Sequence, residues 1–577
     1  MDLHTIRNYE TWLTDPYFGE ETRKELQEIK GNAKEIEDRF YKNLEFGTAG
    51  LRGIIGAGTN RMNIYTVRRV TQGLADHIKT QGKDAMAGGV VIAYDCRHFS
   101  KEFTQEAALV LAANGIKAYV FEDLRPTPEL SFAVRQCKAT AGIVITASHN
   151  PPDYNGYKVY WDDGAQINTF LATKIIDAID QIPDFNTIKR IEQKEAEFYG
   201  LYHELGKEMD DLYIEEVKAQ CLRPDLIKKE GKDFKVIFTP LHGTANLHIR
   251  QVLKEVGFEQ VIVVPEQECP DPNFSTVKSP NPEEREAFAL AIELAEKEGA
   301  DLIIGTDPDG DRVGAVVKNK TGQYIVLTGN QTGALLIHYI LDNLKDKNEI
   351  PVDGKIIKTI VTSEMGTKIA ANYGVEMLNT LTGFKFIAEQ IKGFESTGKG
   401  AFIFGYEESY GYLKGTYARD KDAVVAAMLI CEMAASYREK DMNLYDGLLA
   451  LYEEYGYFAE GLKSITLKGK EGLEKIQSII EKLRSQPIKK VGDRKVLILE
   501  DYLLQQRKDM VTGKVETMML PPSNVLKLKL EGNAWITLRP SGTEPKLKVY
   551  GAVQEKTLEE SHKKLEEIIE YMLEVIK

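Results

Sequence analysis

Three aspartates stand at alternate positions in one short segment. Asp307, Asp309 and Asp311 lie in TDPDGDR, directly after the apolar run DLIIG. At an effective dielectric of ~20, two unit charges ~4 Å apart repel by about 4 kcal/mol, so a cation is needed to gather buried carboxylates. Hard oxygen ligands favour Mg²⁺, Mn²⁺ or Ca²⁺. An EF-hand is excluded because Lys318 stands where its last glutamate belongs. The alternative is a solvated acidic turn.

A second segment offers a nucleophile. Ser148 and His149 follow the apolar run AGIVIT, and Lys158 lies further along the same segment. A serine hydroxyl attacks only when a base removes its proton or a partner orients it, and adjacent side chains on an extended loop diverge. The alternative is a turn rich in Asn and Pro in which the serine caps the local backbone.

A third segment, GYEESYG, offers acceptors between aromatic residues. Glu407 and Glu408 could each accept two well-directed hydrogen bonds from sugar hydroxyls, and the tyrosines could wall a sugar ring. The alternative is the first turn of a helix, where acidic residues are favourable. Lys421 adds a positive charge downstream, which is equally typical of a helix end.

A fourth segment, RPSGTEPK, suits a phosphate. Arg539 supplies a guanidinium fork, Ser541 and Thr543 supply hydroxyls, and Gly542 completes a turn with free amides. The alternative is an ordinary turn with Pro and Gly. A similar segment near the start, FGTAGLRG, would bring Arg52 towards an anion but is weak evidence alone.

The elements that must position these segments follow an α/β rhythm. Three successive sets of short apolar runs alternate with amphipathic stretches, and each set ends in one of the polar segments: GIVIT runs into ASHN, DLIIG into TDPDGDR, and AFIFG into YEESYG. Ligands of such sheets gather at the carboxyl ends of strands. The sequence therefore predicts an internal repeat whose three loops face one cleft.

The C-terminal region has a different pattern. Its strands come consecutively, and leucines at 526, 528 and 530 alternate with Val525, Lys527 and Lys529. We expect one buried and one solvated face, in an α+β domain with antiparallel pairing. A charged helical lead-in is expected over 20–42, with no role assigned. The expected domains are 1–207, 208–326, 327–450 and 451–577.

Charge, apolar runs, cysteines and missing motifs exclude several classes of protein. The 577 residues carry 74 Lys and Arg against 88 Asp and Glu, a net charge of −14, which argues against a chain that coats nucleic acid. The longest apolar run, 423–431, is too short to span a membrane, and we expect no export because the opening residues MDLHTIRNYE lack the apolar run of a signal sequence. Five scattered cysteines without C-x-x-C fit a reducing cytoplasm. Walker A, G-x-G-x-x-G, G-x-S-x-G and H-E-x-x-H patterns are absent.

The segments TASHNPPDYNGYKVY, GTDPDGDR, GYEESYGY and RPSGTEPKLKVY, in this order, resemble the four signature loops of the α-D-phosphohexomutase superfamily. The resemblance covers nearly the whole chain from Phe46. The leading FGTAGLRG is similar to the longer bacterial phosphoglucomutases. The fold implied is three related mixed-sheet α/β domains plus a C-terminal α+β domain around a central cleft.

The resemblance also implies residue roles. Ser148 would be carried as phosphoserine and complete an Mg²⁺ site formed by Asp307, Asp309 and Asp311. Glu407 and Ser409 would hold sugar hydroxyls. Arg539, Ser541, Gly542 and Thr543 would hold the phosphate that does not react. The residues that match positive or proton-handling positions near the transferred phosphoryl group are Arg52, His149, Lys158, Arg312 and Lys421; which of them is the general base stays open.

The expected activity is therefore an intramolecular phosphotransferase that interconverts glucose 1-phosphate and glucose 6-phosphate, with glucose 1,6-bisphosphate as activator. The expected partners are small sugar phosphates, without nucleic acid or membrane, in a cytoplasmic monomer or small homo-oligomer. Many bifunctional phosphomannomutases have a sugar loop similar to G-E-M-S-G-H. This chain has Glu408 and Tyr410 where that motif has Met and Gly, and this difference favours glucose phosphates as substrates. The alternatives are a phosphomannomutase, a phosphopentomutase, a sugar bisphosphate synthase or phosphatase using the same serine, and a non-catalytic descendant.

Overall fold

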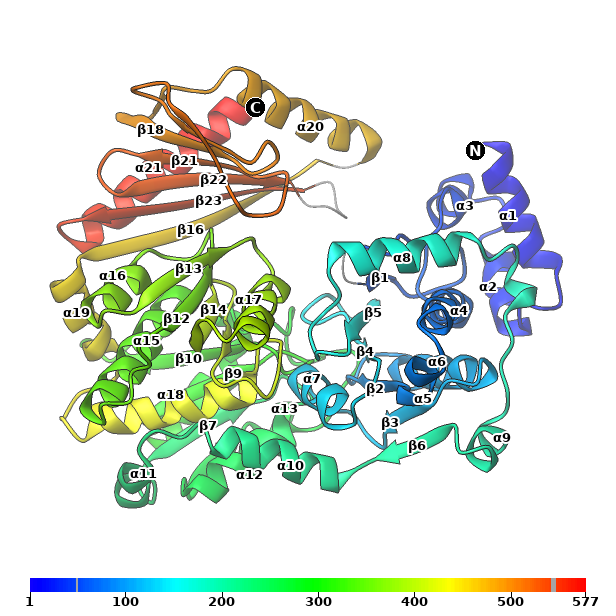
Figure 1. Ribbon diagram of the computed structural model, residues 1–577, viewed down its shortest axis with the longest axis horizontal. Helices are drawn as coiled ribbons and strands as arrows, with labels where there is room; N and C mark the ends of the chain where they lie inside the picture. Colours follow the sequence, from blue (N-terminus) through cyan, green and yellow to red (C-terminus); the bar gives the residue numbers. More distant parts are fainter. Residues whose placement is uncertain (48–49, 468, 541–545) are drawn as a thin grey trace. The chain divides into compact units, whose positions relative to one another are not determined.

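The computed structural model describes residues 1–47, 50–467, 469–540 and 546–577. Its contacts divide the chain into two compact units, each of which is discontinuous in sequence. The first contains Met1–Leu327, Ala388–Ser396 and Tyr410–Lys440, and the second contains Thr328–Ile387, Thr397–Ser409 and Asp441–Lys577. Figure 1 gives the labels used for the helices and strands.

The N-terminal lead-in is three short helices: α1 (Leu3–Thr14), α2 (Glu20–Glu28) and α3 (Ala33–Phe40). The expected helical stretch over 20–42 is interrupted at Gly31, whose φ of +92° lies in the left-handed region. Trp12 holds the helices together: its ring stacks on Phe18 at 4.2 Å and meets Phe40 and Tyr65 edge-on. Since Tyr65 belongs to the next helix, α4 (Ile64–Thr80), the lead-in packs on the first α/β domain.

The first sheet has six strands in the order β1-β5-β4-β2-β3-β6. β2, β3, β4 and β6 are mutually parallel, whereas β5 runs antiparallel between β4 and β1. The strands are β1 (Gly50–Ile54), β2 (Val90–Tyr94), β3 (Ala118–Phe121), β4 (Ala141–Ile145), β5 (Tyr154–Trp161) and β6 (Tyr202–Leu205). The helices are α4 (Ile64–Thr80), α5 (Lys83–Gly88), α6 (Ser100–Ala113), α7 (Thr127–Gln136), α8 (Thr169–Asp180) and α9 (Gln193–Phe198), with a 3-10 turn η1 (Phe185–Thr187).

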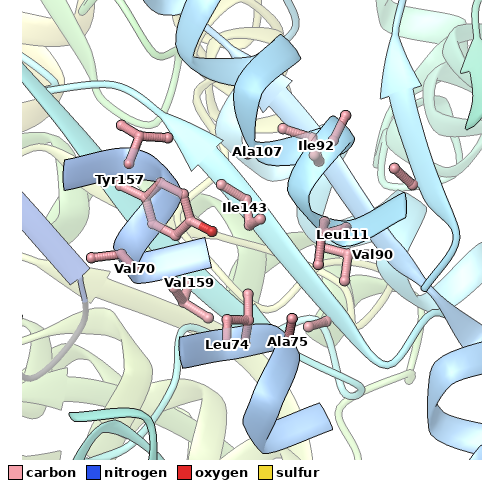
Figure 2. Packing of buried hydrophobic residues seen from close by; sticks show 14 of the residues in the cluster. Val70, Leu74, Ala75, Val90, Ile92, Ala107, Leu111, Ile143, Tyr157 and Val159 are labelled. Carbon is pink, nitrogen blue, oxygen red and sulfur yellow. The ribbon is translucent and has the colours of Figure 1, made fainter. Parts of the chain in front are cut away.

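The core of this domain lies where helices α4 and α6 meet the central strands (Figure 2). Leu74 of α4 and Leu111 of α6 pack against Ile92 of β2, Ile143 of β4 and Val159 of β5. β2 and β4 are buried along their whole length, as expected for parallel strands covered on both faces. The apolar runs that precede the polar loops are therefore core strands.

The second sheet, also in the first unit, has the order β11-β10-β9-β7-β8. Its strands are β7 (Lys235–Thr239), β8 (Gln260–Val263), β9 (Leu302–Thr306), β10 (Val313–Lys318) and β11 (Tyr324–Val326). Its helices are α10 (Lys207–Lys218), α11 (Pro224–Glu230), α12 (Asn246–Val256), α13 (Pro265–Glu268) and α14 (Ala289–Glu298), with the 3-10 turn η2 (Arg285–Phe288). The strand β15 (Gly411–Leu413) and the apolar helix α18 (Ala423–Arg438) come from later in the chain but belong to this unit, and α18 packs against α10, α11 and α12.

The second unit holds the third α/β sheet. β12 (Gly354–Thr359) pairs in parallel with both β13 (Glu376–Thr380) and β14 (Ala401–Glu407). The accompanying helices are α15 (Gly329–Asp346), α16 (Met365–Asn372) and α19 (Leu444–Tyr455). Helix α17 (Phe384–Thr397) is divided, because its residues Ala388–Ser396 belong to the first unit. β4, β9 and β14, the strands that precede the three polar loops, each lie beside the first parallel strand of their sheet, β2, β7 and β12. This shared position supports the predicted repeat.

The C-terminal sheet is antiparallel throughout, in the order β16-β23-β22-β21-β18-β19-β20, with β17 on β18. Its strands are β16 (Tyr457–Thr466), β17 (Lys490–Val491), β18 (Arg494–Asp501), β19 (Gln506–Asp509), β20 (Val515–Thr517), β21 (Leu526–Leu530), β22 (Ala534–Pro540) and β23 (Lys546–Glu555). The helices are α20 (Gly469–Ser485) and α21 (Leu558–Ile576). The three leucines of β21 lie in the core between sheet and helices, as predicted.

The prediction of a solvated opposite face is wrong for part of β21. Val525 is buried in a cluster with Ile360, Val361 and Trp535, because the start of this strand packs on the loop that follows β12. Lys527 is only 3% exposed, and its Nζ donates to the carbonyl of Ile360 at 2.6 Å. Burial lowers the pKa of Lys527 to about 7.

Candidate functional site

The three aspartates occupy the turn between β9 and β10, where a fully buried strand ends. One oxygen from each of Asp307, Asp309 and Asp311 lies within 4.8 Å of the others, and each side chain is at most 2% exposed. The turn needs Gly310 at φ +66°, where an added Cβ would lie 2.8 Å from Pro126. The predicted acidic cluster therefore exists, and it is buried rather than a solvated turn.

The donor set of this cluster fits a divalent cation. Asp307 Oδ1 accepts the backbone N–H groups of Asp311 and Arg312 at 3.1 and 3.0 Å, which fixes its carboxylate. Within the described residues, Oδ1 of Asp309 and Oδ1 of Asp311 are buried without a hydrogen-bond partner. Buried carboxylate oxygens without partners are costly, and a hard cation satisfies them.

Two lysines partly offset the acidic charge. Lys158 Nζ on β5 donates to Asp309 Oδ2 at 2.6 Å, and Lys421 Nζ lies 3.1 Å from Asp311 Oδ2. Burial opposes ionisation of Asp309, but the charge of Lys158 outweighs it and lowers the pKa of Asp309 below its usual range. For Asp307, burial and then the charge of Asp309 raise the pKa well above the usual range. One of three carboxylates is thus driven towards its neutral form when no other cation is present.

Ser148 stands at the end of β4 and faces the same cluster. Its Oγ donates to Asp307 Oδ2 at 2.9 Å and lies 3.1 Å from Nδ1 of His149. Its φ of +52° is in the left-handed region, which costs a serine of order 1 kcal/mol and persists only where the surroundings enforce it. The hydroxyl predicted as nucleophile and the carboxylates predicted to hold a metal are therefore in direct contact.

The strained backbone of the serine loop is held by Arg97, which the sequence analysis did not single out. Its Nη1 donates to the carbonyls of Pro151 and Tyr154 at 2.7 and 3.0 Å, and its Nη2 donates to the carbonyls of Ser148 and Asn150. One arginine thus satisfies four carbonyls of the loop.

Asp95, which also was not singled out, holds the loop from its other end. It accepts hydrogen bonds from Thr146 Oγ1 at 2.6 Å and from Ser100 Oγ at 2.9 Å. Asp95 and Arg97 follow β2 in YDCRHFS, so the signal was an aspartate and an arginine at the carboxyl end of a core strand.

Three further predicted residues of the first unit are His149, Arg52 and Arg312, of which the histidine is neutral and the two arginines are charged. Burial, followed by the charges of Arg312 and Arg52, lowers the pKa of His149 well below its usual value, so this imidazole is neutral near pH 7. Arg52 Nη1 donates to Asn150 Oδ1 at 3.1 Å, and the Arg312 guanidinium pairs with Glu283. Arg52 thus contacts the serine loop directly, whereas Arg312 acts on His149 through its charge.

The predicted sugar loop belongs to the second unit. Glu407 ends β14, is 5% exposed and accepts the backbone N–H of Gly383 at 2.9 Å. Glu408 Oε2 accepts from the hydroxyls of Thr359 and Thr362 at 3.1 and 3.2 Å. Ser409 follows and is partly exposed.

The predicted phosphate segment begins at the end of β22 in the second unit. Arg539 is partly exposed, and in the sheet register it faces Lys548 of β23. The other predicted phosphate ligands, Ser541, Gly542 and Thr543, lie outside the described residues. No helix in the described part of the chain is long and apolar enough to cross a membrane.

Comparison with known protein families gives three matches, in chain order. Residues 43–185, 211–322 and 328–455 match models described as phosphoglucomutase/phosphomannomutase, alpha/beta/alpha domains I, II and III. Together with the C-terminal antiparallel sheet, these account for the predicted fold class of three related α/β domains plus a C-terminal α+β domain.

Curated relatives and solved structures agree with these matches. The chain is 39% identical to the phosphoglucomutase of Staphylococcus haemolyticus, covering 89% of this chain and 91% of that protein. It is 40% identical to the phosphoglucomutase of Staphylococcus aureus strain MRSA252, with the same coverage. The fold resembles the open form of parafusin from Paramecium, with a TM-score of 0.66 at 18% identity over 93% of this chain and 95% of that chain. It also resembles a phosphoglucomutase/phosphomannomutase family protein from Burkholderia thailandensis, with a TM-score of 0.64 at 19% identity over 92% and 96%.

Proposed function

The chain belongs to the phosphoglucomutase/phosphomannomutase family, and we propose that it interconverts α-D-glucose 1-phosphate and D-glucose 6-phosphate through a phosphorylated Ser148. The observation that carries this proposal is the contact of Ser148 Oγ with Asp307 at 2.9 Å, inside a buried acidic trio. The two staphylococcal phosphoglucomutases, at 39% and 40% identity, support the choice of glucose phosphates.

The reaction would be two phosphoryl transfers with opposite directions. In the first, a sugar hydroxyl attacks the phosphorus on Ser148, a new P–O bond to the sugar forms, and the bond to Oγ breaks. The product is glucose 1,6-bisphosphate, which would return its other phosphate to Ser148 after turning over. In-line transfer needs little covalent chemistry from the protein and depends on positioning and on charge neutralisation.

Charge neutralisation is the task we assign to the acidic loop and its lysines. A phosphoserine carries a charge of about −1.5 to −2 near neutral pH, so it cannot lie against three bare carboxylates. Asp307, Asp309 and Asp311 would hold Mg²⁺, which when bound supplies positive charge beside the phosphoryl oxygens. Lys158, which already contacts Asp309 at 2.6 Å, would be free to turn towards the phosphoryl group once a cation balances that carboxylate.

Proton transfer needs a neutral base, and His149 fits this role better than Lys158. Burial alone would lower the pKa of Lys158, but Asp309 and Asp311 raise it above the usual value, so the amine stays charged. The lowered pKa of His149 keeps its imidazole neutral near pH 7, and its Nδ1 lies 3.1 Å from Ser148 Oγ, beside the atom where the phosphoryl group is transferred. We therefore assign His149 as the acceptor of the sugar hydroxyl proton, and Arg52, Arg312 and Lys421 as charge-stabilising groups.

Sugar and phosphate recognition would come from the second unit. We assign Glu407 and Ser409 to the sugar hydroxyls, and Arg539 with Ser541, Gly542 and Thr543 to the phosphate that does not react. Glu408 is engaged by Thr359 and Thr362, so we propose that it shapes the loop instead of contacting the sugar.

The central experiment is the Mg²⁺-dependent conversion of α-glucose 1-phosphate to glucose 6-phosphate with trace glucose 1,6-bisphosphate as activator, coupled to oxidation of the product. Ser148→Ala should abolish turnover and remove one phosphate from the intact mass. Ser436→Ala, a buried serine on α18 away from the loop, serves as the control and should keep both. Turnover that survives in Ser148→Ala would refute the proposal.

Substrate choice is tested by the same assay with other sugars. Faster turnover of mannose or ribose phosphates would move the assignment to a phosphomannomutase or phosphopentomutase. Accumulation of the bisphosphate would indicate a synthase, and release of inorganic phosphate would indicate a phosphatase. The cytoplasmic location, the oligomeric state and the four domain boundaries stay predictions.

A further inference from the structure

Helix α10, which follows the last strand of the first sheet and precedes the second sheet, carries two buried polar side chains. Asp210 is 3% exposed and Tyr213 is fully buried. Both lie away from Ser148 in sequence, and neither belongs to any of the four signature segments. Each begins a chain of hydrogen bonds and ion pairs, joined by one short backbone link, that ends on an aspartate of the acidic loop.

The first chain runs from Asp210 through Arg125 to Asp309. Arg125 donates from Nε and Nη2 to the two oxygens of Asp210, at 2.7 and 2.9 Å, a bidentate geometry that fixes the guanidinium. Two residues further, Thr127 begins α7 and contacts Asp309 twice. Its N–H donates to the Asp309 carbonyl at 2.9 Å, and its Oγ1 donates to Asp309 Oδ2 at 3.0 Å.

Buried charges surround this chain and balance one another. His248 Nε2 on α12 lies 2.9 Å from Glu129 Oε2 on α7 and 3.9 Å from Asp210 Oδ1. Burial lowers the pKa of His248, but Glu129 and Asp210 outweigh it and raise this pKa to about 9. Burial raises the pKa of Glu129 to about 7, so the ion pair of His248 with Glu129 is complete only above this pH, whereas Arg125 and Asp210 form a fixed pair. The buried polar contacts of this cluster hold α7, α10 and α12 together.

The second chain runs from Tyr213 through Asp422 to Asp311. The Tyr213 hydroxyl lies 2.9 Å from both oxygens of Asp422, which caps α18 by accepting the N–H groups of Val424 and Val425. The preceding residue, Lys421, reaches Asp311 Oδ2 at 3.1 Å. The first residue of α18 also donates its N–H to the carbonyl of Gly310.

We propose that Asp210 and Tyr213 of α10 are positioning residues for the proposed metal site, because they fix the acidic loop from two sides through Thr127 and Asp422. This inference rests on the proposed function. In the described part of the chain, the Ser148 hydroxyl has its hydrogen-bond partners in His149 and Asp307 and not in α10; α10 sets where Asp309 and Asp311 stand. Outer-shell groups of this kind typically change metal affinity by about 10- to 100-fold when removed.

The test measures binding of Mn²⁺ alone to the full chain by electron paramagnetic resonance, with thermal unfolding recorded without metal. Thr127→Val and Tyr213→Phe should each raise the Mn²⁺ dissociation constant about tenfold. Thr127→Ser keeps the hydroxyl and should bind close to wild type. Tyr452→Phe removes a buried hydroxyl that accepts from Gln331 in the other unit, and it should lower only the unfolding temperature.

Double variants test whether the contacts act as two separate chains. Asp210→Asn and Thr127→Val lie on one chain, so their combination should stay near the tenfold loss of a single variant. Tyr213→Phe and Thr127→Val lie on different chains, so their fold-changes should multiply to about 100-fold. Asp210→Asn removes a buried charge. If this variant fails to fold, the Mn²⁺ affinities of Tyr213→Phe and Thr127→Val still test the proposal.

Two results would overturn the inference. Wild-type Mn²⁺ affinity in Tyr213→Phe and Thr127→Val, with lowered unfolding temperatures, would show that the chains only stabilise the fold. Multiplying effects of Asp210→Asn and Thr127→Val would refute the single chain. Failure of the proposed function looks different: Mn²⁺ binding that persists in Asp309→Ala would place the metal elsewhere.

Discussion

Lys527 allows a quantitative test of the buried face of β21. Its ammonium nitrogen lies 4.4 Å from the centre of the Trp535 ring, and its pKa is lowered from 10.5 to about 7, first by burial and then by Lys358. Between these two values the unfolded chain holds a proton that the folded chain lacks. The free energy of unfolding must therefore rise with pH from about 7 to about 10.5.

The magnitude follows from the linkage relation. A full proton difference adds about 1.4 kcal/mol per pH unit, so Lys527 should add about 2 kcal/mol of stability between pH 7.5 and 9. Lys527→Met keeps the length and apolar character of the stem but has no proton to lose. The gain in stability of this variant over wild type should therefore shrink by about 2 kcal/mol over the same range.

The assay is urea unfolding followed by Trp535 fluorescence, in a background where Trp12 and Trp161 are replaced by Phe. Trp535 is then the one tryptophan of the chain and reports on its own domain. The control is Lys495→Met on β18 of the same domain, whose side chain is 64% exposed, and its stability should depend on pH as that of wild type does. Equal pH dependence in Lys527→Met and wild type would refute the reasoning.

Three further predictions concern the site. Asp309→Ala should abolish turnover and leave the unfolding temperature within a few degrees of wild type; retained turnover would remove Asp309 from the site. Arg539→Ala should raise KM for glucose 1-phosphate about tenfold and change kcat less, because it removes binding present in both ground and transition states; a loss confined to kcat would contradict this role. Arg97→Met leaves four carbonyls of the serine loop without their donor. Because small misplacements of reacting groups slow a reaction strongly, kcat should fall at least about 100-fold. An unchanged kcat in steady-state assays would show that the loop keeps its shape without Arg97.

The acidic loop was predictable because its information is local. Asp307, Asp309 and Asp311 lie within five consecutive residues, directly after a run that forms a buried strand. The α/β rhythm was predictable for the same reason, since the period of apolar residues reports on the strand or helix that contains them. Burial of the three leucines of β21 followed from this period as well.

Contacts between distant segments were not predictable in this way. Arg97 and Ser148 are 51 residues apart, and nothing in the local pattern of either indicates the other. The sequence pattern predicted that Lys527 is solvated, because alternation of apolar and charged residues separates the two faces of a strand. The pattern does not show which other segment covers the charged face. The partner of Lys527, the carbonyl of Ile360, lies 167 residues away in the loop that follows β12.

The return of α18 to the first unit has a consequence for synthesis on the ribosome. A nascent chain that has emerged to residue 327 contains Ser148 and all three aspartates, yet Lys421 and Asp422 are still missing. The faces of α10, α11 and α12 that α18 covers then stay exposed to water and to other chains. The catalytic centre should therefore assemble only after residue 440 has emerged, and chains halted earlier should depend on chaperones.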